Sequence, residues 1–227
     1  MKRTKLRDRE LPGYSRGEEL FNMISHIVGG GLGVLICIAC IIKAFLSGGV
    51  YEIIAAFLYG LSMILLYTMS SLYHGLKEGT AKRVFQVLDH CTIYLLIAGT
   101  YTPVALCALR RLSPPLGWTI FGIVWGLSAL GIVFNAIDLK RYSKLSMVLY
   151  LLLGWCVILT GKQAITAMGI PCLLYMLAGG ISYTVGAVFY GIGGSRPVPI
   201  SYMHAVFHLF VVVGSVVHFV GIFLYIL

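Results

Sequence analysis

The chain has 227 residues, of which 59% are hydrophobic and only 11% are charged, whereas soluble domains carry about 25% charged residues. This composition excludes a soluble domain and predicts a membrane protein. The formal net charge of +9 does not indicate a nucleic-acid partner, because the basic residues lie at the ends of hydrophobic runs, as a topology signal does.

Seven hydrophobic runs follow one another along the chain, and a run of about 20 apolar residues crosses a bilayer as a helix. Only short connections separate the runs, so we expect an all-α, seven-transmembrane-helix bundle that forms a single domain over residues 1–227. The first 21 residues are too polar for a cleavable signal peptide and are expected to form a cytoplasmic tail. The expected spans are Asn22–Leu46, Glu52–Gly75, Phe85–Ala108, Leu116–Ile137, Leu145–Gly161, Ile170–Tyr190 and Tyr202–Ile226.

The distribution of positive charge predicts the orientation of the bundle. All but four of the 17 Lys and Arg residues lie in the N-terminal tail and in the second, fourth and sixth connections, the last of which holds Arg196. Because basic residues in short loops stay on the cytoplasmic side, we expect the N-terminus inside. After seven crossings the C-terminus is then outside.

Small and sulfur-containing residues are expected to serve packing. The six cysteines are scattered through the apolar runs, and the Cys37–Cys40 pair has no second pair with which to complete a four-cysteine site, so we interpret all six as buried, reduced side chains. The stretch Gly29–Gly33 lacks the strand-then-helix context of a phosphate loop. It is interpreted as a place where helices approach closely.

Ionisable side chains inside membrane helices are costly and therefore mark functional sites. The predicted topology places five of the six histidines, and the one carboxylate that lies well inside a helix, in the cytoplasmic leaflet. Structural histidines scattered at random would not share one leaflet. The residues at this depth are His26, His74, Asp89, His90, His204 and His208.

The spacing within this group predicts a metal site. His204 and His208 are four residues apart and lie on one helix face, where two imidazoles can bind one ion. With His74 as third ligand, the site has the three-ligand, open-position arrangement of catalytic zinc. Asp89 is the expected partner of a water nucleophile, as its general base or as an acceptor that orients it. Ser70, one turn deeper than His74, is expected to hydrogen-bond the water, a ligand or a substrate carbonyl.

A simpler interpretation applies to each residue taken singly, because a lone histidine or serine in a membrane helix commonly hydrogen-bonds a neighbouring helix. We expect Asp89 to face the site and His90, about 100° further round the helix, to face away. His218 lies about 15 Å along the helix from His208. It is expected to make a packing contact in the outer leaflet.

The ordered set of short motifs resembles the bacterial hemolysin III proteins, which are relatives of the progestin and adipoQ receptors and, more distantly, of alkaline ceramidases. The resemblance covers nearly the whole chain. The chain lacks the long soluble N-terminal domain of adiponectin receptors, which disfavours hormone binding of that kind. The motifs are Glu19-x2-Asn22-x3-His26, Ser70-x3-His74, Asp89 in LDHCTIYLLIAGTYTP, and His204-x3-His208.

The resemblance implies a seven-helix protein of the bacterial plasma membrane with its N-terminus inside. It also implies a zinc ion held by His74, His204 and His208, with Asp89 holding the water and Ser70 beside it. The receptor relatives are associated with hydrolysis of ceramide-like lipid amides. The motif of residues 19, 22 and 26 has no assigned metal role, and we expect it to tie the first helix to its neighbours through polar contacts.

Three functions remain open from the sequence. The first is a zinc-dependent hydrolase of an amide or ester bond in a membrane lipid, which makes membrane lipids the expected partner and nucleic acid an unexpected one. The second is a pore-forming cytolysin, which the family name suggests but which needs a polar lining along the whole pore. The third is a receptor or regulator of lipid composition with a structural zinc ion.

Overall fold

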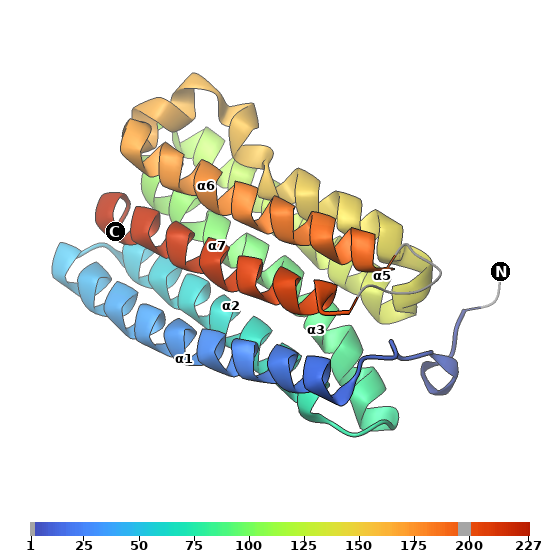
Figure 1. Cartoon of the computed structure of the whole chain (residues 1–227). Coiled ribbons are helices and arrows are strands. Elements are labelled where there is room, and N and C mark those ends of the chain that lie inside the picture. The colour runs from blue at the N-terminus through green and yellow to red at the C-terminus, as the bar shows by residue number, and fades with distance from the viewer. Residues whose placement is uncertain (1–2, 195–200) are drawn as a thin grey trace.

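The computed structural model describes residues 3–194 and 201–227, and every regular element in that part of the chain is a helix. Six of the helices are long and apolar enough to cross a membrane, and they pack side by side as a bundle (Figure 1). The all-helical membrane architecture expected from the sequence is therefore confirmed. The long helices are α1 (Arg16–Ser47), α2 (Val50–Gly75), α3 (Thr80–Pro103), α5 (Pro114–Gly154), α6 (Lys162–Gly194) and α7 (Met203–Tyr225).

The first long helix begins earlier than the hydrophobic run predicts. Ser15 precedes α1 as its N-cap and accepts a hydrogen bond from the Glu18 backbone N–H at 3.3 Å, while a Glu18 carboxylate oxygen accepts from the Ser15 N–H at 2.9 Å. This capping box satisfies backbone donors that the first turn leaves free. As a result, residues 16–21, which were predicted to belong to the tail, are helical.

Helix α3, together with the helical turns that continue it to Leu112, is the most buried of the six candidate membrane spans. It ends at Pro103, which has no backbone N–H to donate, and the chain continues as a π-helical segment, Val104–Leu109. A short helix α4, Arg110–Leu112, follows. Every residue of the π-helical segment is buried. This agrees with the rule that irregular backbone inside a membrane is tolerated only where protein covers it.

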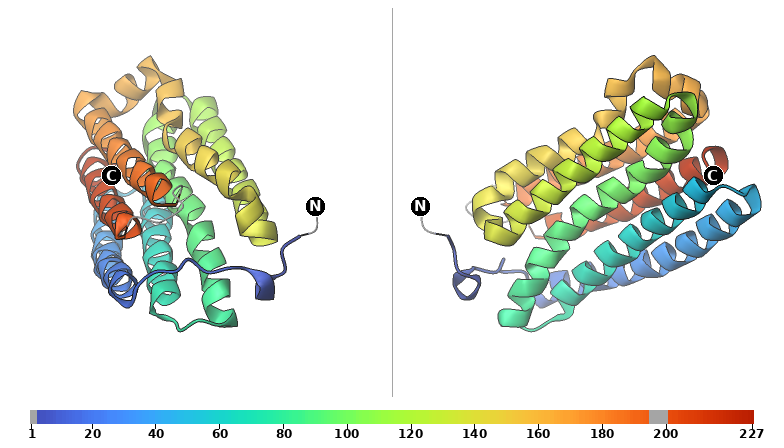
Figure 2. Two further views of the ribbon diagram at one scale, coloured as in Figure 1. Left: turned by 45° about the vertical axis from the view of Figure 1, so that its right-hand side comes forward. Right: turned by 180° about the vertical axis from the view of Figure 1, so that it is seen from behind.

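Helix α5 is 41 residues long and contains one non-helical residue, Asp138, with φ −159° and ψ 95°. The Asp138 carboxylate accepts a hydrogen bond from the Arg141 backbone N–H at 3.2 Å, as an N-cap residue does at the start of a helix. The ribbon of α5 runs to the end of the bundle at which α1 begins and reverses its direction there (Figure 2). The predicted seven-residue connection at 138–144 is therefore a single-residue break.

The region after α5 also differs from the predicted spans. The expected fifth span ends in a 3-10 helix, Cys156–Thr160, and most of the connection expected at 161–169 is helical. Helix α6 contains one non-helical residue, Gly169, whose φ of 75° is left-handed, a conformation that glycine adopts without steric cost. The sixth predicted connection, with Arg196, lies outside the described residues.

The surface and interior of the bundle are those of a membrane protein. Large exposed hydrophobic side chains occur on all six long helices, as expected for surfaces that face lipid. All six cysteines are free, and all except Cys37 are buried. Gly29 packs against Tyr67, where an added Cβ would lie 2.8 Å from the ring, so this part of the glycine-rich stretch does serve close helix packing.

Candidate metal centre

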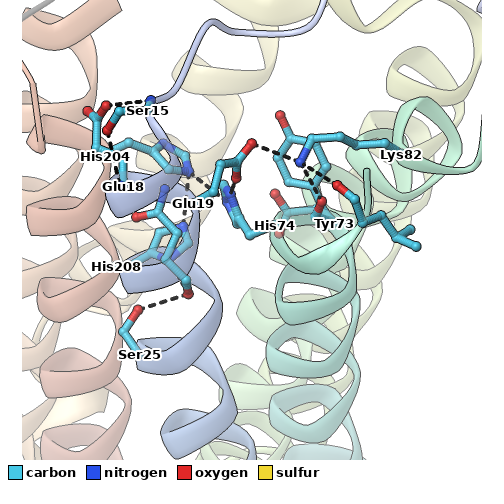
Figure 3. A network of polar contacts seen from close by, with 12 residues as sticks. Ser15, Glu18, Glu19, Ser25, Tyr73, His74, Lys82, His204 and His208 are labelled. Carbon is cyan, nitrogen blue, oxygen red and sulfur yellow. Dashed lines mark hydrogen bonds and ion pairs between the residues drawn. The ribbon is translucent and has the colours of Figure 1, made fainter. Parts of the chain in front are cut away.

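Three buried histidines from two helices converge at the end of the bundle where α1 and α7 begin. The Nε2 atom of His204 lies 3.3 Å from Nε2 of His74 and 3.0 Å from Nε2 of His208. One ligand nitrogen of each residue lies within 4.8 Å of the others. The structure thus brings together the three histidines that the sequence predicts as metal ligands (Figure 3).

Helix geometry explains this convergence. His204 and His208 occupy the first two turns of α7 and lie one above the other on its face. His74 is the penultimate residue of α2, so its side chain reaches the same level from a neighbouring helix. Residues that are 130 positions apart in the sequence therefore meet because two helix ends coincide.

The other ring nitrogens of two of these histidines contact α1. His74 Nδ1 donates to a carboxylate oxygen of Glu19 at 2.5 Å, and His208 Nδ1 donates to the backbone carbonyl of Asn22 at 3.4 Å. A histidine that donates its Nδ1–H to such a partner has its tautomer and ring orientation fixed, with Nε2 free to bind a metal. The Glu19 side chain and the Asn22 backbone therefore support the cluster, a role that the sequence does not predict.

The third residue of that motif packs directly on a cluster histidine. The rings of His26 and His208 are stacked, with centroids 3.6 Å apart and planes 7° from parallel. Neither ring nitrogen of His26 has a hydrogen-bond partner among the described residues. Glu19 thus ties α1 to a neighbouring helix through a polar side-chain contact, as expected, whereas Asn22 does so through its backbone carbonyl and His26 through ring stacking.

The donor set fits a divalent metal ion. Three imidazole nitrogens leave a fourth position open, which is the arrangement of catalytic rather than structural zinc. Imidazole also suits copper, iron and nickel, so ligand type alone does not select the metal. Ser70 is fully buried one turn from His74, and within the described part of the chain its hydroxyl has no hydrogen-bond partner. The residues present therefore fit a bound ion with a further polar ligand beside it.

A cavity of about 110 Å³ adjoins the cluster and lies among α3, α5, α6 and α7. Asp89, His204 and His208 are part of its wall, and most of the remaining lining side chains are apolar. Asp89 is buried, and its carboxylate lies 3.8 Å from His90 Nδ1. The predicted carboxylate thus shares a cavity with two of the predicted ligands, whereas Ser70 and His74 stand on the α2 side of the cluster.

The sequence predicts that His90 faces away from the site, and the structure shows that it does not. It lines the same cavity as Asp89, and its Nδ1 donates to the backbone carbonyl of Gln86 at 2.9 Å. His90 therefore joins the polar residues that border the site.

A second, larger cavity of about 460 Å³ lies between α3, α5 and the N-terminal segment, which we define as residues 3–15. Many of its lining side chains are polar or charged, including Glu10 and Lys140. It shares part of its wall with the first cavity. The shared residues are His90, Met147, Tyr150 and Tyr190.

The N-terminal segment covers the cluster from this side. The ring of Tyr14 stacks on that of His204, with centroids 5.1 Å apart. Burial raises the pKa of the Tyr14 hydroxyl, so a neutral phenol packs over the histidines. The Thr4 backbone N–H donates to the carboxylate of Asp138 at 2.8 Å, which holds the start of the segment against the break in α5.

His218 lies apart from this site. It is buried deeper along α7, and its Nε2 donates to the backbone carbonyl of Met176 at 3.0 Å. Gly179 on α6 packs against the ring. His218 is therefore a helix-packing residue, as the sequence predicted.

The chain matches known proteins over nearly its whole length. A family model described as "Haemolysin-III related" matches residues 14–219. The chain belongs to the hemolysin III family. Hemolysin-3 of Bacillus cereus is 40% identical over 213 residues, 92% of each chain, and the hemolysin-3 homolog of Bacillus subtilis (strain 168) is 36% identical over 208 residues, 92% of this chain and 94% of that one.

More distant relatives of this hemolysin III protein occur in animals. The human monocyte to macrophage differentiation factor is 30% identical over 186 residues, 79% of this chain and 74% of that one. The family, the Bacillus relatives and the six apolar helices together make the chain a multi-pass integral protein of the bacterial plasma membrane.

Proposed function

We propose that this protein is a zinc-dependent hydrolase that cleaves an amide or ester bond of a membrane lipid. The observation that carries the proposal is the convergence of His74, His204 and His208 beside a cavity that also contains the buried carboxylate of Asp89. Three neutral nitrogen ligands, an open position and a nearby base are the components of hydrolytic zinc sites.

The proposal includes seven membrane crossings with the N-terminus inside. A continuous 41-residue helix would be about 60 Å long, twice the hydrocarbon thickness of about 30 Å. The break at Asp138 supports two crossings within α5, and the two termini lie at opposite ends of the bundle (Figure 1). With the basic N-terminal segment in the cytoplasm, the histidine cluster belongs to the inner leaflet.

The chain's own residues have distinct roles in this reaction. A zinc ion held by the three histidines supplies Lewis-acid polarisation of the substrate carbonyl and makes water a better nucleophile at neutral pH. Asp89 accepts a proton from the attacking water and returns it to the leaving nitrogen or oxygen as the carbon–heteroatom bond breaks. Ser70 donates a hydrogen bond that orients the water or the carbonyl. The products are a carboxylic acid and an amine or alcohol.

The two adjoining cavities indicate how a lipid would lie. The cavity beside the cluster has mainly apolar walls and suits a hydrocarbon chain, whereas the cavity under the N-terminal segment carries charged and hydroxyl groups and suits a polar headgroup and water. Asp89 lines the first cavity, and its neighbour His90 lines both. The bond to be cleaved would thus lie where apolar and polar surroundings meet.

A turnover assay tests this proposal. Purified wild-type protein loaded with zinc is incubated with vesicles that contain labelled lipid amides or esters, and the release of labelled acid is measured. We expect turnover that is lost in His208→Ala and in Asp89→Asn. Zinc present in the wild type without turnover of any lipid amide or ester would contradict the hydrolase assignment.

Two alternatives remain, and two other measurements separate them from the hydrolase. A receptor or regulator with structural zinc is favoured by the way the cluster joins α2 to α7 and contacts α1; it predicts unfolding on metal removal without turnover. A pore-forming cytolysin is suggested by the name of the Bacillus cereus relative, hemolysin-3. It predicts conductance in reconstituted bilayers that persists in the histidine variants.

A further inference from the structure

The first turn of α1 carries two consecutive glutamates that contact different helices. Glu18 accepts a hydrogen bond from the backbone N–H of Tyr202 at 2.7 Å, directly before α7. Glu19 reaches His74 at the end of α2 with one carboxylate oxygen, and its other oxygen lies 2.8 Å from the ammonium group of Lys82 near the start of α3. Figure 3 shows Glu19 between His74 and Lys82.

Lys82 is unusual because it is a buried lysine whose side chain makes three polar contacts. Besides Glu19, its ammonium group donates to the backbone carbonyls of Tyr73 at 3.0 Å and Leu76 at 3.1 Å. An ammonium group has three N–H donors, so every donor has a partner. The two carbonyls belong to the C-terminal end of α2, where a positive charge is favourable. The ammonium position is therefore fixed by α2 independently of Glu19.

This arrangement gives Glu19 a fixed orientation. A carboxylate on a flexible side chain can rotate, but one with an oxygen on Lys82 and the other on His74 cannot rotate without breaking a charge-assisted hydrogen bond. Glu19 in turn fixes the ring of His74 so that Nε2 points at the other two cluster histidines. The chain of contacts thus runs from Lys82 through Glu19 to His74.

We infer that Lys82 is a positioning residue of the metal centre and that it acts on the metal only through Glu19. The inference rests on the metal site of the proposed function and adds a residue that does not belong to any of the motifs. The competing interpretation is that Lys82 only holds the end of α2 through the two carbonyls. The two interpretations differ in what a loss of Lys82 does to metal affinity.

Metal affinity of the full-length protein in detergent is the decisive measurement. Competition with a chelator gives the zinc affinity of the wild type, Lys82→Met, Glu19→Leu and the double variant. Loss of a residue that orients a ligand typically costs about 10- to 100-fold in metal affinity, and we expect that range for each single variant. Lys77→Met is the matched control, because Lys77 is exposed in the α2–α3 connection and should leave the affinity unchanged.

The double variant tests whether Lys82 acts through Glu19. In the Glu19→Leu background, Lys82→Met should cause no further loss of affinity, since leucine has no oxygen to accept from His74 or Lys82 and the intermediate contact is gone. Losses that multiply in the double variant would overturn the inference. So would a Lys82→Met protein with wild-type zinc affinity and a lowered unfolding temperature, which is the result expected if Lys82 only stabilises α2.

Two further measurements keep the test decisive. Cobalt in place of zinc should show altered absorption bands in both single variants, because the His74 ring has changed orientation. If Lys82→Met does not fold, Lys82→Arg keeps the charge and changes its shape, and it should still weaken zinc binding severalfold; unchanged binding would overturn the inference.

Because affinity rather than turnover is measured, a metal-binding but inactive wild type would contradict only the hydrolase proposal, whereas a wild type that binds no metal would contradict both.

Discussion

His26 on α1 stacks face to face on His208 of α7, with ring centroids 3.6 Å apart and planes 7° from parallel. The stack, together with the contact from Nδ1 to the Asn22 carbonyl, restricts rotation of the His208 ring. His26 therefore has a packing role toward the cluster that needs a flat ring and does not need a nitrogen.

A pair of substitutions at His26 tests this role. His26→Phe retains a flat ring and should bind zinc nearly as well as the wild type, whereas His26→Ala leaves the His208 ring free to rotate and should bind zinc more weakly, by up to about 10-fold. Zinc affinity by chelator competition distinguishes the two. Equal loss in both variants would show instead that a His26 nitrogen is needed.

Substitution of Asp89 should separate catalysis from metal binding. Asp89→Asn keeps the shape of the side chain and removes its ability to accept a proton, so the turnover of a lipid amide or ester should fall by about 10²- to 10⁴-fold. Zinc content should stay at the wild-type level because Asp89 is not one of the three ligands. Loss of zinc together with activity would indicate that Asp89 is itself a ligand.

The sequence was sufficient to predict the helical class and the proximity of the three cluster histidines, whose binding of a metal stays a prediction. Both succeed because they depend on helix periodicity and on depth: His204 and His208 share a face by their four-residue spacing, and His74 ends a helix at the same level. These relations hold for any bundle in which consecutive hydrophobic runs cross the membrane in opposite directions. No detail of helix packing is needed to obtain them.

The parts that the sequence did not predict depend on packing between helices. The roles of Glu19 and Lys82 arise because α1, α2 and α3 meet at one end, and neighbouring helices cannot be identified from hydrophobic runs. The shared face of the motif at residues 19, 22 and 26 was a usable signal, but its target was not visible. The sharp break at Asp138 was also missed, because a single capping residue replaces the expected loop.

Close packing at Gly131 predicts a stability effect. An added Cβ at this position would overlap the ring of Tyr94, so Gly131→Ala should destabilise the protein by about 1–3 kcal/mol through overpacking. Gly126→Ala on the same helix is the control, since its Cβ would meet nothing within 4 Å. Thermal unfolding in detergent should show a clear loss for position 131 and none for position 126. Comparable losses at both positions would contradict the packing of α5 against α3.

Removal of the Tyr14 ring should change how fast metal leaves the site. Tyr14 stacks on His204 from the side of the N-terminal segment, so Tyr14→Ala should speed zinc release to an excess of chelator severalfold, whereas Tyr14→Phe should not. Stopped-flow mixing with a chromogenic chelator measures the rate. A release rate that is the same in all three proteins would mean that this segment does not cover the path to the metal.

The metal content of the purified protein tests the central claim most directly. Elemental analysis of wild-type protein, prepared without added chelator, should find about one zinc ion per chain, and protein with His74, His204 and His208 all replaced by alanine should contain almost none while remaining folded. Wild-type protein without a stoichiometric divalent metal, or a triple variant that retains the wild-type amount, would contradict the account.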